Sequence, residues 1–243
     1  MYSSFLQRSY DQLIHDAALQ KLPMVICVDR AGFNNSDGVT HHGIFDVAFA
    51  SHIPGIKIYA PVTYGGIEQS LSTALYDDCV SIIRYPSGSE NEKINSTFYK
   101  CDKIEKIGVK TDFSNEEKPK TLIITHGRIV AECLRAKELI ADDKRVGVLL
   151  CEYIAPYDSL ADEISEIMDR VHPQNLLFVE EEIKNGGFGM ILSEALRLKG
   201  ALLGIDFDIL AATNAFVSRR EGEPRGFRSR WARCSTSCFP TRP

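Results

Sequence analysis

Residues 22–46 read LPMVICVDRAGFNNSDGVTHHGIFD, and this stretch decides the fold class. Its apolar run MVICVD, at 24–29, predicts a short strand that is covered on both faces. The polar segment at 29–43 is rich in glycine and other turn residues, so it predicts a loop of functional length. Because α/β proteins bind ligands at the carboxyl ends of parallel strands, this loop is the first candidate site.

Helices and strands are predicted to alternate on both sides of this stretch. Apolar side chains at 3–20 have helical spacing, and Pro23 ends that helix. Further strands are predicted at 57–61, 79–85, 121–127, 145–152, 175–182 and 204–210, with helices at 64–77, 128–141, 158–170 and 190–200. Strands separated by such helices form parallel sheets with right-handed crossovers. We therefore expect an α/β protein with two consecutive doubly wound domains and mainly parallel sheets.

The domain boundaries follow from changes in composition. A polar, turn-rich stretch begins at Pro86, which predicts a first domain at 1–92, a linker at 93–117 and a second domain at 118–217. Residues 218–243 differ in character: they contain seven arginines and no lysine. This basic, atypical tail has three interpretations: a disordered tail, a basic interaction arm, or translation of a different reading frame. The tail starts abruptly where another helix is expected, and this favours the hypothesis that it is translated from a different reading frame.

Charge and composition exclude several classes of protein. The formal net charge is -5, but residues 219–243 carry +5 and the remaining 218 residues carry -10. Such an acidic body repels phosphate backbones, so nucleic acid is not an expected partner. The chain has no apolar run of the roughly 20 residues that a membrane span needs, and no visible secretory signal. Seven scattered cysteines favour a reducing compartment, and we expect a cytoplasmic protein.

The loop at 29–43 carries groups that are suited to chemistry. Arg30 offers a fork of donors for a phosphate or carboxylate, and His41 is suited to proton transfer near neutral pH. The alternative is a surface loop whose polar side chains only make local turns. A metal site at the adjacent His41 and His42 is disfavoured, because neighbouring side chains point apart and no matching ligand spacing follows. No metal ligand is assigned.

Several blocks together carry a family resemblance. YSSFLQRSYDQLIHD at 2–16, SDGVTHHGIFD at 36–46 and FVEEEIKNGGFGMILSEAL at 178–196 are the longest, and LPMVICVDRAG, IPGIKIYAP and IIRYPSG lie between them. In order and spacing they resemble the 1-deoxy-D-xylulose-5-phosphate synthase family of thiamine-diphosphate enzymes, over residues 2–217. The resemblance implies a truncated transketolase pyrimidine-binding domain followed by a transketolase C-terminal domain. The β subunits of 2-oxo acid dehydrogenases share this plan but have a different histidine motif.

The resemblance also implies an activity. Members of the family are transferases that condense pyruvate with D-glyceraldehyde 3-phosphate and release carbon dioxide. Their product leads to isoprenoids, thiamine and pyridoxal, and they act as homodimers with thiamine diphosphate and Mg²⁺. The Mg²⁺-binding motif, of the GDG type, does not occur in this sequence. The glutamate that activates the cofactor precedes the block that starts here at Tyr2, so activity of this chain alone is doubtful. The alternative is a non-catalytic remnant or interaction module.

Site residues follow from the same resemblance. It implies that Phe5 stacks on the aminopyrimidine of the cofactor with Arg8 beside it, and that Tyr2 and Arg30 hold the triose phosphate. Without the family, Phe5 would be interpreted as a core aromatic residue, Arg8 as an exposed helix charge and Tyr2 as a frayed terminus. The resemblance assigns substrate binding and proton transfer to His41.

The remaining assignments concern polar groups around this pocket. Asp37 is expected in the same pocket, and Arg84 fits a strand-end salt bridge as well as a site role. The family usually has a phosphate-binding arginine where Ser87 stands, and its absence weakens the expected triose-phosphate site. The family commonly has glycine where Asn35 stands, but asparagine tolerates left-handed backbone angles and can substitute for it. Roles are also expected for two aspartates, Asp29 and Asp46, and for three consecutive glutamates, Glu180, Glu181 and Glu182. We expect the aspartates to be structural and the glutamates to form a solvated or subunit-facing edge.

Overall fold

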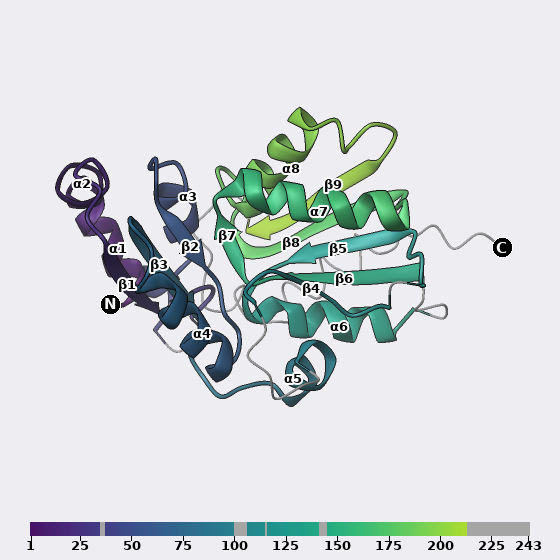
Figure 1. The fold of residues 1–243 in the computed structure, drawn as a ribbon. Coiled ribbons are helices and arrows are strands. Elements are labelled where there is room, and N and C mark those ends of the chain that lie inside the picture. The colour runs from purple at the N-terminus through teal and green to yellow at the C-terminus, as the bar shows by residue number, and fades with distance from the viewer. Residues whose placement is uncertain (35–36, 100–105, 115, 141–144, 213–243) are drawn as a thin grey trace.

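The computed structural model describes residues 1–34, 37–99, 106–114, 116–140 and 145–212. They form two α/β units that lie side by side, as the purple-to-blue and teal-to-yellow halves of Figure 1 show. The expected fold class, two α/β domains with mainly parallel sheets, is confirmed. Asn35 and the basic tail at 218–243 lie outside the described residues.

The first unit is built on a four-stranded sheet. Its strand order is β1 (Met24–Asp29), β3 (Val80–Tyr85), β2 (Lys57–Tyr59) and β7 (Tyr153–Ala155). The first three strands are parallel, whereas β7 comes from the second half of the chain and pairs with β2 in the antiparallel sense. The helical segments of this unit are α1 (Ser3–Leu6), η1 (Gln7–Ser9), α2 (Tyr10–Gln12), η2 (Leu13–Ala18), η3 (Val39–His41), α3 (Asp46–Ala50) and α4 (Tyr64–Ala74).

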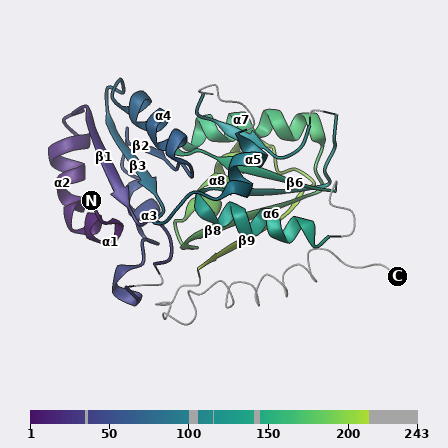
Figure 2. The same cartoon turned by 90° about the horizontal axis from the view of Figure 1, so that it is seen from below.

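The second unit contains a five-stranded sheet. Its order is β4 (Val109–Thr111), β6 (Val146–Cys151), β5 (Thr121–Thr125), β8 (Asn175–Ile183) and β9 (Asp206–Ala212), and only β4 is antiparallel to its neighbour. The helical segments are α5 (Glu92–Phe98), η4 (Gly127–Ile129), α6 (Val130–Glu138), α7 (Tyr157–Val171) and α8 (Phe188–Leu198). Helices α7 and α8 cover one face of this sheet and α6 covers the other (Figures 1 and 2). Strands β5 and β6 are therefore buried along their whole length.

One prediction about local structure is wrong. Strand β1 was expected to be covered on both faces, but only Val28 in it is buried, because β1 is the edge strand of its sheet. The predicted linker at 93–117 is not a plain connection. It contains most of α5 and all of β4, because the backbone of β4 pairs with β6.

The two units share one hydrophobic core. Leu6, Val28 and Ile58 of the first unit belong to the same buried cluster as Leu122 and Phe178 of the second. Together with the β2–β7 pairing, this cluster fixes the two sheets against each other. Within the described part of the chain, no helix has both the length and the apolar character needed to cross a membrane.

Candidate functional site

Backbone hydrogen bonds between Gly32 and Gly43 close the neck of the loop that follows β1, that is, the point where its two ends meet. Gly32 and Gly43 each donate an amide to the carbonyl of the other, both at 2.8 Å. Arg30 has a φ of +60°, a left-handed conformation that costs non-glycine residues roughly 1–2 kcal/mol. Gly32 also has a positive φ, of +87°.

The head of the loop is tied to the start of α1 by three polar side chains. The Tyr2 hydroxyl donates to Asp37 Oδ2 at 2.7 Å. Asn34 Nδ2 donates to the same carboxylate oxygen at 2.8 Å and also to the Tyr2 hydroxyl. Partial burial and the bond to Asp37 raise the pKa of Tyr2, so this phenol stays protonated at neutral pH.

An aromatic cluster adjoins these polar groups. The His41 ring lies edge-on to Tyr2 at 5.2 Å and to Phe5 at 5.8 Å between ring centroids. The guanidinium of Arg30 lies 4.7 Å from the Tyr2 ring centroid, and that of Arg8 lies 5.4 Å from the Phe5 ring centroid. Both distances allow cation–π attraction. Arg30 is also ion-paired with Asp29.

The structure therefore brings all the site residues named from the family resemblance into one cluster: Tyr2, Phe5, Arg8, Arg30, Asp37 and His41. The interpretation of Phe5 as a core residue is wrong, because its side chain is 44% exposed. Tyr2 is not frayed either, since its backbone bridges to Asp29 and its hydroxyl is bonded. The cluster combines an exposed aromatic ring, two guanidinium groups and an imidazole, which suits an anionic ligand with a planar part.

The two adjacent histidines have different environments. His42 is buried, and its Nδ1 accepts a hydrogen bond of 3.0 Å from the Asn34 amide. His41 is partly exposed, and its Nδ1 lies 2.8 Å from Thr40 Oγ1. One imidazole therefore supports the loop from inside, while the other faces the aromatic cluster.

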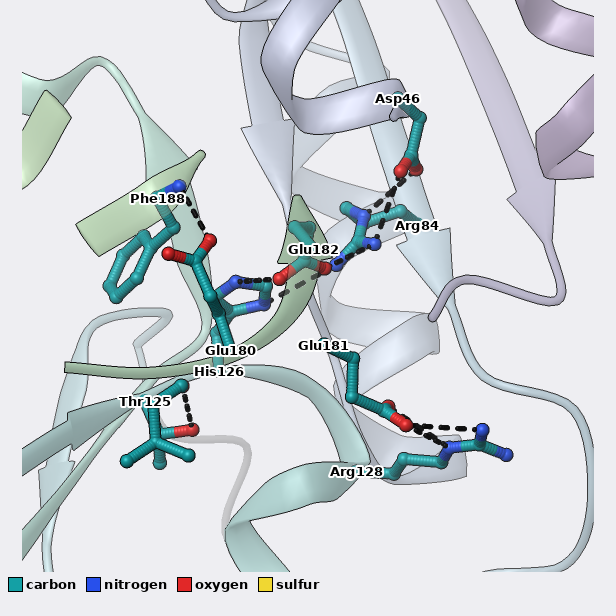
Figure 3. A network of polar contacts seen from close by, with 10 residues as sticks. Asp46, Arg84, Thr125, His126, Arg128, Glu180, Glu181, Glu182 and Phe188 are labelled. Atoms are coloured by element: carbon teal, nitrogen blue, oxygen red, sulfur yellow. Dashed lines mark hydrogen bonds and ion pairs between the residues drawn. The ribbon is translucent and has the colours of Figure 1, made fainter. Parts of the chain in front are cut away.

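A second polar cluster is buried between the two units (Figure 3). Arg84 of β3 binds Asp46 through Nε at 3.0 Å and binds Glu182 of β8 through Nη2 at 2.6 Å. His126, which follows β5, has its Nε2 at 3.1 Å from Glu182 Oε2, within ion-pair distance but without hydrogen-bond alignment. All four side chains are at most 4% exposed. For Arg84, this salt bridge is the interpretation that the structure supports, and the expected structural role of Asp46 matches its contacts.

The three consecutive glutamates do not form a solvated or subunit-facing edge. Glu180 and Glu182 are 0% and 1% exposed, so that expectation is wrong. Successive strand residues point to opposite faces, which directs Glu180 and Glu182 into the interior and Glu181 toward Arg128. Glu181 Oε2 lies 3.0 Å from Arg128 Nε.

Glu180 explains the Gly-Gly-x-Gly turn that follows it. Its two carboxylate oxygens accept the amides of Phe188 and Gly189, at 2.7 and 3.0 Å, and so cap the start of α8. A Cβ at Gly187 would lie 2.6 Å from Glu180 Oε2, so the turn needs glycine for close approach. The start of this helix is thus occupied by a carboxylate of the chain itself.

The two buried glutamates have opposite pKa shifts. Burial and the charge of Glu182 raise the pKa of Glu180 to about 8, against the effect of the two helix amides. Burial also acts to raise the pKa of Glu182, but His126 and Arg84 outweigh it and hold that pKa near 2. Burial and the nearby Glu182 charge therefore oppose the ionisation of Glu180, whereas Arg84 and His126 favour the ionised form of Glu182.

One group of side chains in the described part of the chain has metal-ligand geometry, namely His126, Glu180 and Glu182 within 4.8 Å of one another. Its donor atoms are already engaged: Glu180 by the α8 amides and Glu182 by Arg84 and His126. Mg²⁺ prefers oxygen ligands and keeps several waters, which an imidazole in a closed core does not match. This cluster does not fit the magnesium ion that the family resemblance implies.

Several residues of these clusters were not found by sequence reasoning. Asn34 lies in the predicted loop but between the two quoted blocks at 22–32 and 36–46, and His126 and Arg128 lie in segments without a distinctive motif. Their roles depend on contacts that form only in the folded chain. A signal was present for Glu180, because a carboxylate at the end of a buried strand, followed by a glycine-rich helix start, is suited to cap that helix.

Comparisons with known proteins agree with this architecture. The model of the transketolase pyrimidine binding domain matches residues 1–91, and that of the transketolase C-terminal domain matches residues 110–224. The 1-deoxy-D-xylulose-5-phosphate synthase of Nitratidesulfovibrio vulgaris is 34% identical over 222 residues, which are 90% of this chain and 33% of that protein. That of Listeria innocua is 38% identical over 199 residues, 80% of this chain and 30% of that protein. The chain thus spans about a third of the length of these relatives.

A solved structure extends the comparison to the fold. A split-gene transketolase, described as an inactive beta4 tetramer, superposes with a TM-score of 0.73 at 18% identity. The match covers 95% of this chain and 69% of that one. At this identity the likeness concerns the fold alone.

Proposed function

Because the chain belongs to the transketolase family, of which it carries the pyrimidine-binding and C-terminal domains, we propose that it forms part of a 1-deoxy-D-xylulose-5-phosphate synthase. The reaction would condense pyruvate with D-glyceraldehyde 3-phosphate and release carbon dioxide. Relatives with this name are 34 to 38% identical to the chain. The observation that carries the proposal is the cluster of Tyr2, Asp37, His41 and Arg30, which two separate segments bring together.

Arg30 and Tyr2 are the proposed contacts of the triose phosphate. A guanidinium offers paired donors to a phosphate, and the Tyr2 hydroxyl stays protonated and can donate as well. Asp29 already holds the Arg30 guanidinium in an ion pair, so a bound phosphate would share or displace that partner. His41 would transfer protons at the substrate, since its ring is partly exposed beside Tyr2.

Phe5 and Arg8 fit the pyrimidine end of thiamine diphosphate. The Phe5 ring is exposed rather than packed into the core, and it can stack on a flat heterocycle. When bound, this cofactor supplies the carbon–carbon chemistry that side chains cannot perform. The diphosphate and its Mg²⁺ find no fitting group among the described residues, because the His126 cluster is closed and already paired. We assign their binding, and the activating glutamate, to a polypeptide segment that corresponds to the N-terminal part of the relatives.

The experiment that tests the proposal is reconstitution. The purified chain is titrated calorimetrically with thiamine diphosphate and Mg²⁺, alone and after mixing with a separately expressed N-terminal part of a relative. We expect cofactor binding and pyruvate-dependent product only in the mixture. His41→Ala should lower product formation by roughly 10²- to 10⁴-fold. His15→Ala is the matched control, because His15 is exposed on a helix and pairs only locally with Asp11.

A second candidate function is a non-catalytic interaction module of the transketolase fold. The observation that favours it is Ser87, which stands where the family usually has a phosphate-binding arginine. Absence of cofactor binding and of product in every mixture would support this alternative and refute the first. Stop codons directly upstream of Met1, without a neighbouring partner gene, would point the same way.

A further inference from the structure

The loop at 29–43, which carries the proposed substrate contacts and is called the substrate loop below, is held by the second unit as well as by the first. Arg128, in η4 directly after β5, donates through Nη2 to the carbonyl oxygen of Phe33. The same guanidinium binds Glu181 through Nε at 3.0 Å and through Nη2 at 3.2 Å. One planar group therefore connects the loop to the end of β8 (Figure 3 draws its bonds to Glu181).

Two further contacts secure the neck of this loop. Gly32 packs against Glu181 so closely that a Cβ there would lie 2.5 Å from Oε2. The amide of Ile183 donates to the carbonyl of Ile44 at 3.0 Å. The loop is thus fixed on both sides by the carboxyl end of β8.

Phe33, which Arg128 binds, lies next to Asn34, which binds the polar side chains of the loop. Phe33 is followed by Asn34, whose amide binds His42 and whose side chain binds both Tyr2 and Asp37. A shift of the Phe33 carbonyl moves Asn34 directly, because only one peptide unit separates them. The position of the Tyr2–Asp37 pair therefore depends on the contact from Arg128.

We propose that Arg128 and Glu181 of the C-terminal domain are positioning residues for the substrate loop, setting the geometry of Tyr2, Asp37 and His41. The inference rests on the proposed function for the role of these three residues, but its geometric part is independent of activity. Arg128 and Glu181 touch no reacting atom and act through the loop backbone. The second domain thereby takes part in substrate binding.

Hydrogen exchange measured by mass spectrometry tests this role in the full chain. Arg128→Met should speed exchange of the amides of residues 32–34 and 42–44 by about tenfold or more, because the opening free energy of the loop falls. Arg128→Lys should give a smaller effect, since a lysine keeps a charge near Glu181 but cannot bridge both partners. Exchange in β6 should not change. The matched control is Arg135→Met, which removes an exposed arginine from α6.

The outcomes separate the two proposals. Unchanged loop exchange in Arg128→Met overturns the positioning role. If that variant exchanges faster in β6 as well, the comparison is made with Arg128→Lys, where unchanged loop exchange overturns the role in the same way. In the reconstituted mixture, Arg128→Met should lower kcat/KM by about 10- to 100-fold, with a higher KM for the triose phosphate. A wild-type mixture without product refutes the proposed function, while the exchange result still decides the role of Arg128.

Discussion

Replacing Arg84 by methionine removes a buried cation that binds both Asp46 and Glu182 between the two units. Arg84 is 3% exposed, and both carboxylates are similarly buried. Methionine fills much of the same volume, so the main change is electrostatic. Breaking a buried ion pair by removing one partner costs about 3 to 5 kcal/mol, a large share of the roughly 5–15 kcal/mol that stabilises a typical domain.

This loss should depend on pH in a defined direction. In the wild type the pKa of Glu182 is held at about 2, so its stabilising contribution is present above 4.5 and is lost as the pH falls toward 2. Without Arg84, burial is opposed by His126 alone, so the pKa of Glu182 should rise. In mild acid, protonation of Glu182 then removes the unpaired buried charge and reduces the loss of stability in the variant. The stability difference between wild type and Arg84→Met should be largest near pH 8 and smaller near pH 5.

Urea unfolding followed by far-ultraviolet circular dichroism measures this difference. With a slope of about 2 to 3 kcal/mol per molar urea, the midpoint of Arg84→Met should fall by roughly 1 to 2 M near pH 8. Arg197→Met is the control, because Arg197 and its partner Glu194 lie on the exposed surface of α8. The urea midpoint of this control variant should equal that of the wild type. A loss below about 1 kcal/mol, or one that does not change between the two pH values, would refute the assignment of Arg84 as the central buried cation.

Three further predictions concern single side chains. In the wild type, the raised pKa of Glu180 means that its contribution to the free energy of unfolding is full below pH 4.5 and is lost as the pH rises to about 8. Glu180→Gln should remove this pH-dependent loss, as measured by urea unfolding. An equal dependence of the urea midpoint on pH in variant and wild type would contradict this. Gly187→Ala should lower the urea midpoint because its Cβ would lie 2.6 Å from the Glu180 carboxylate, whereas at Gly65 nothing lies within 4 Å of the new Cβ and alanine should be neutral or stabilising; equal midpoints for the two variants would contradict the packing argument. Tyr2→Phe should raise the KM for the triose phosphate in the reconstituted mixture, with a similar urea midpoint, because it removes the hydroxyl that binds Asp37; an unchanged KM would remove Tyr2 from the substrate site.

Much of the architecture could be predicted from local patterns. The apolar runs at 121–125 and 146–151 identify strands that are buried along their whole length, and the helical spacing of α7 identifies a helix with one buried face. Strand β7 escaped prediction because it has three residues, and its place in the sheet depends on pairing with β2, far away in the sequence. The exposed edge at β1 escaped for a similar reason, since an apolar run does not show whether a neighbour covers it.

The candidate site divides in the same way. The sequence by itself determined the loop after β1, and its resemblance to a known family named the residues that gather there, because Tyr2, Phe5, Arg30 and His41 lie in the blocks that carry this resemblance. Only the tertiary structure decided that Phe5 is exposed, since burial depends on what packs against a residue. Two segments of the chain converge to form this one cluster of side chains.

The charged residues between the units show the limit of sequence reasoning. These residues come from four separate segments, namely α3 (Asp46), β3 (Arg84), the connection after β5 (His126) and β8 (Glu182), and each is an ordinary polar residue in its own segment. A charge is tolerated in the core only when partners from other elements compensate its lost hydration. Their burial and the lowered pKa of Glu182 are therefore properties of the assembled fold, whereas most of the order of strands and helices follows from the local periodicity of the chain.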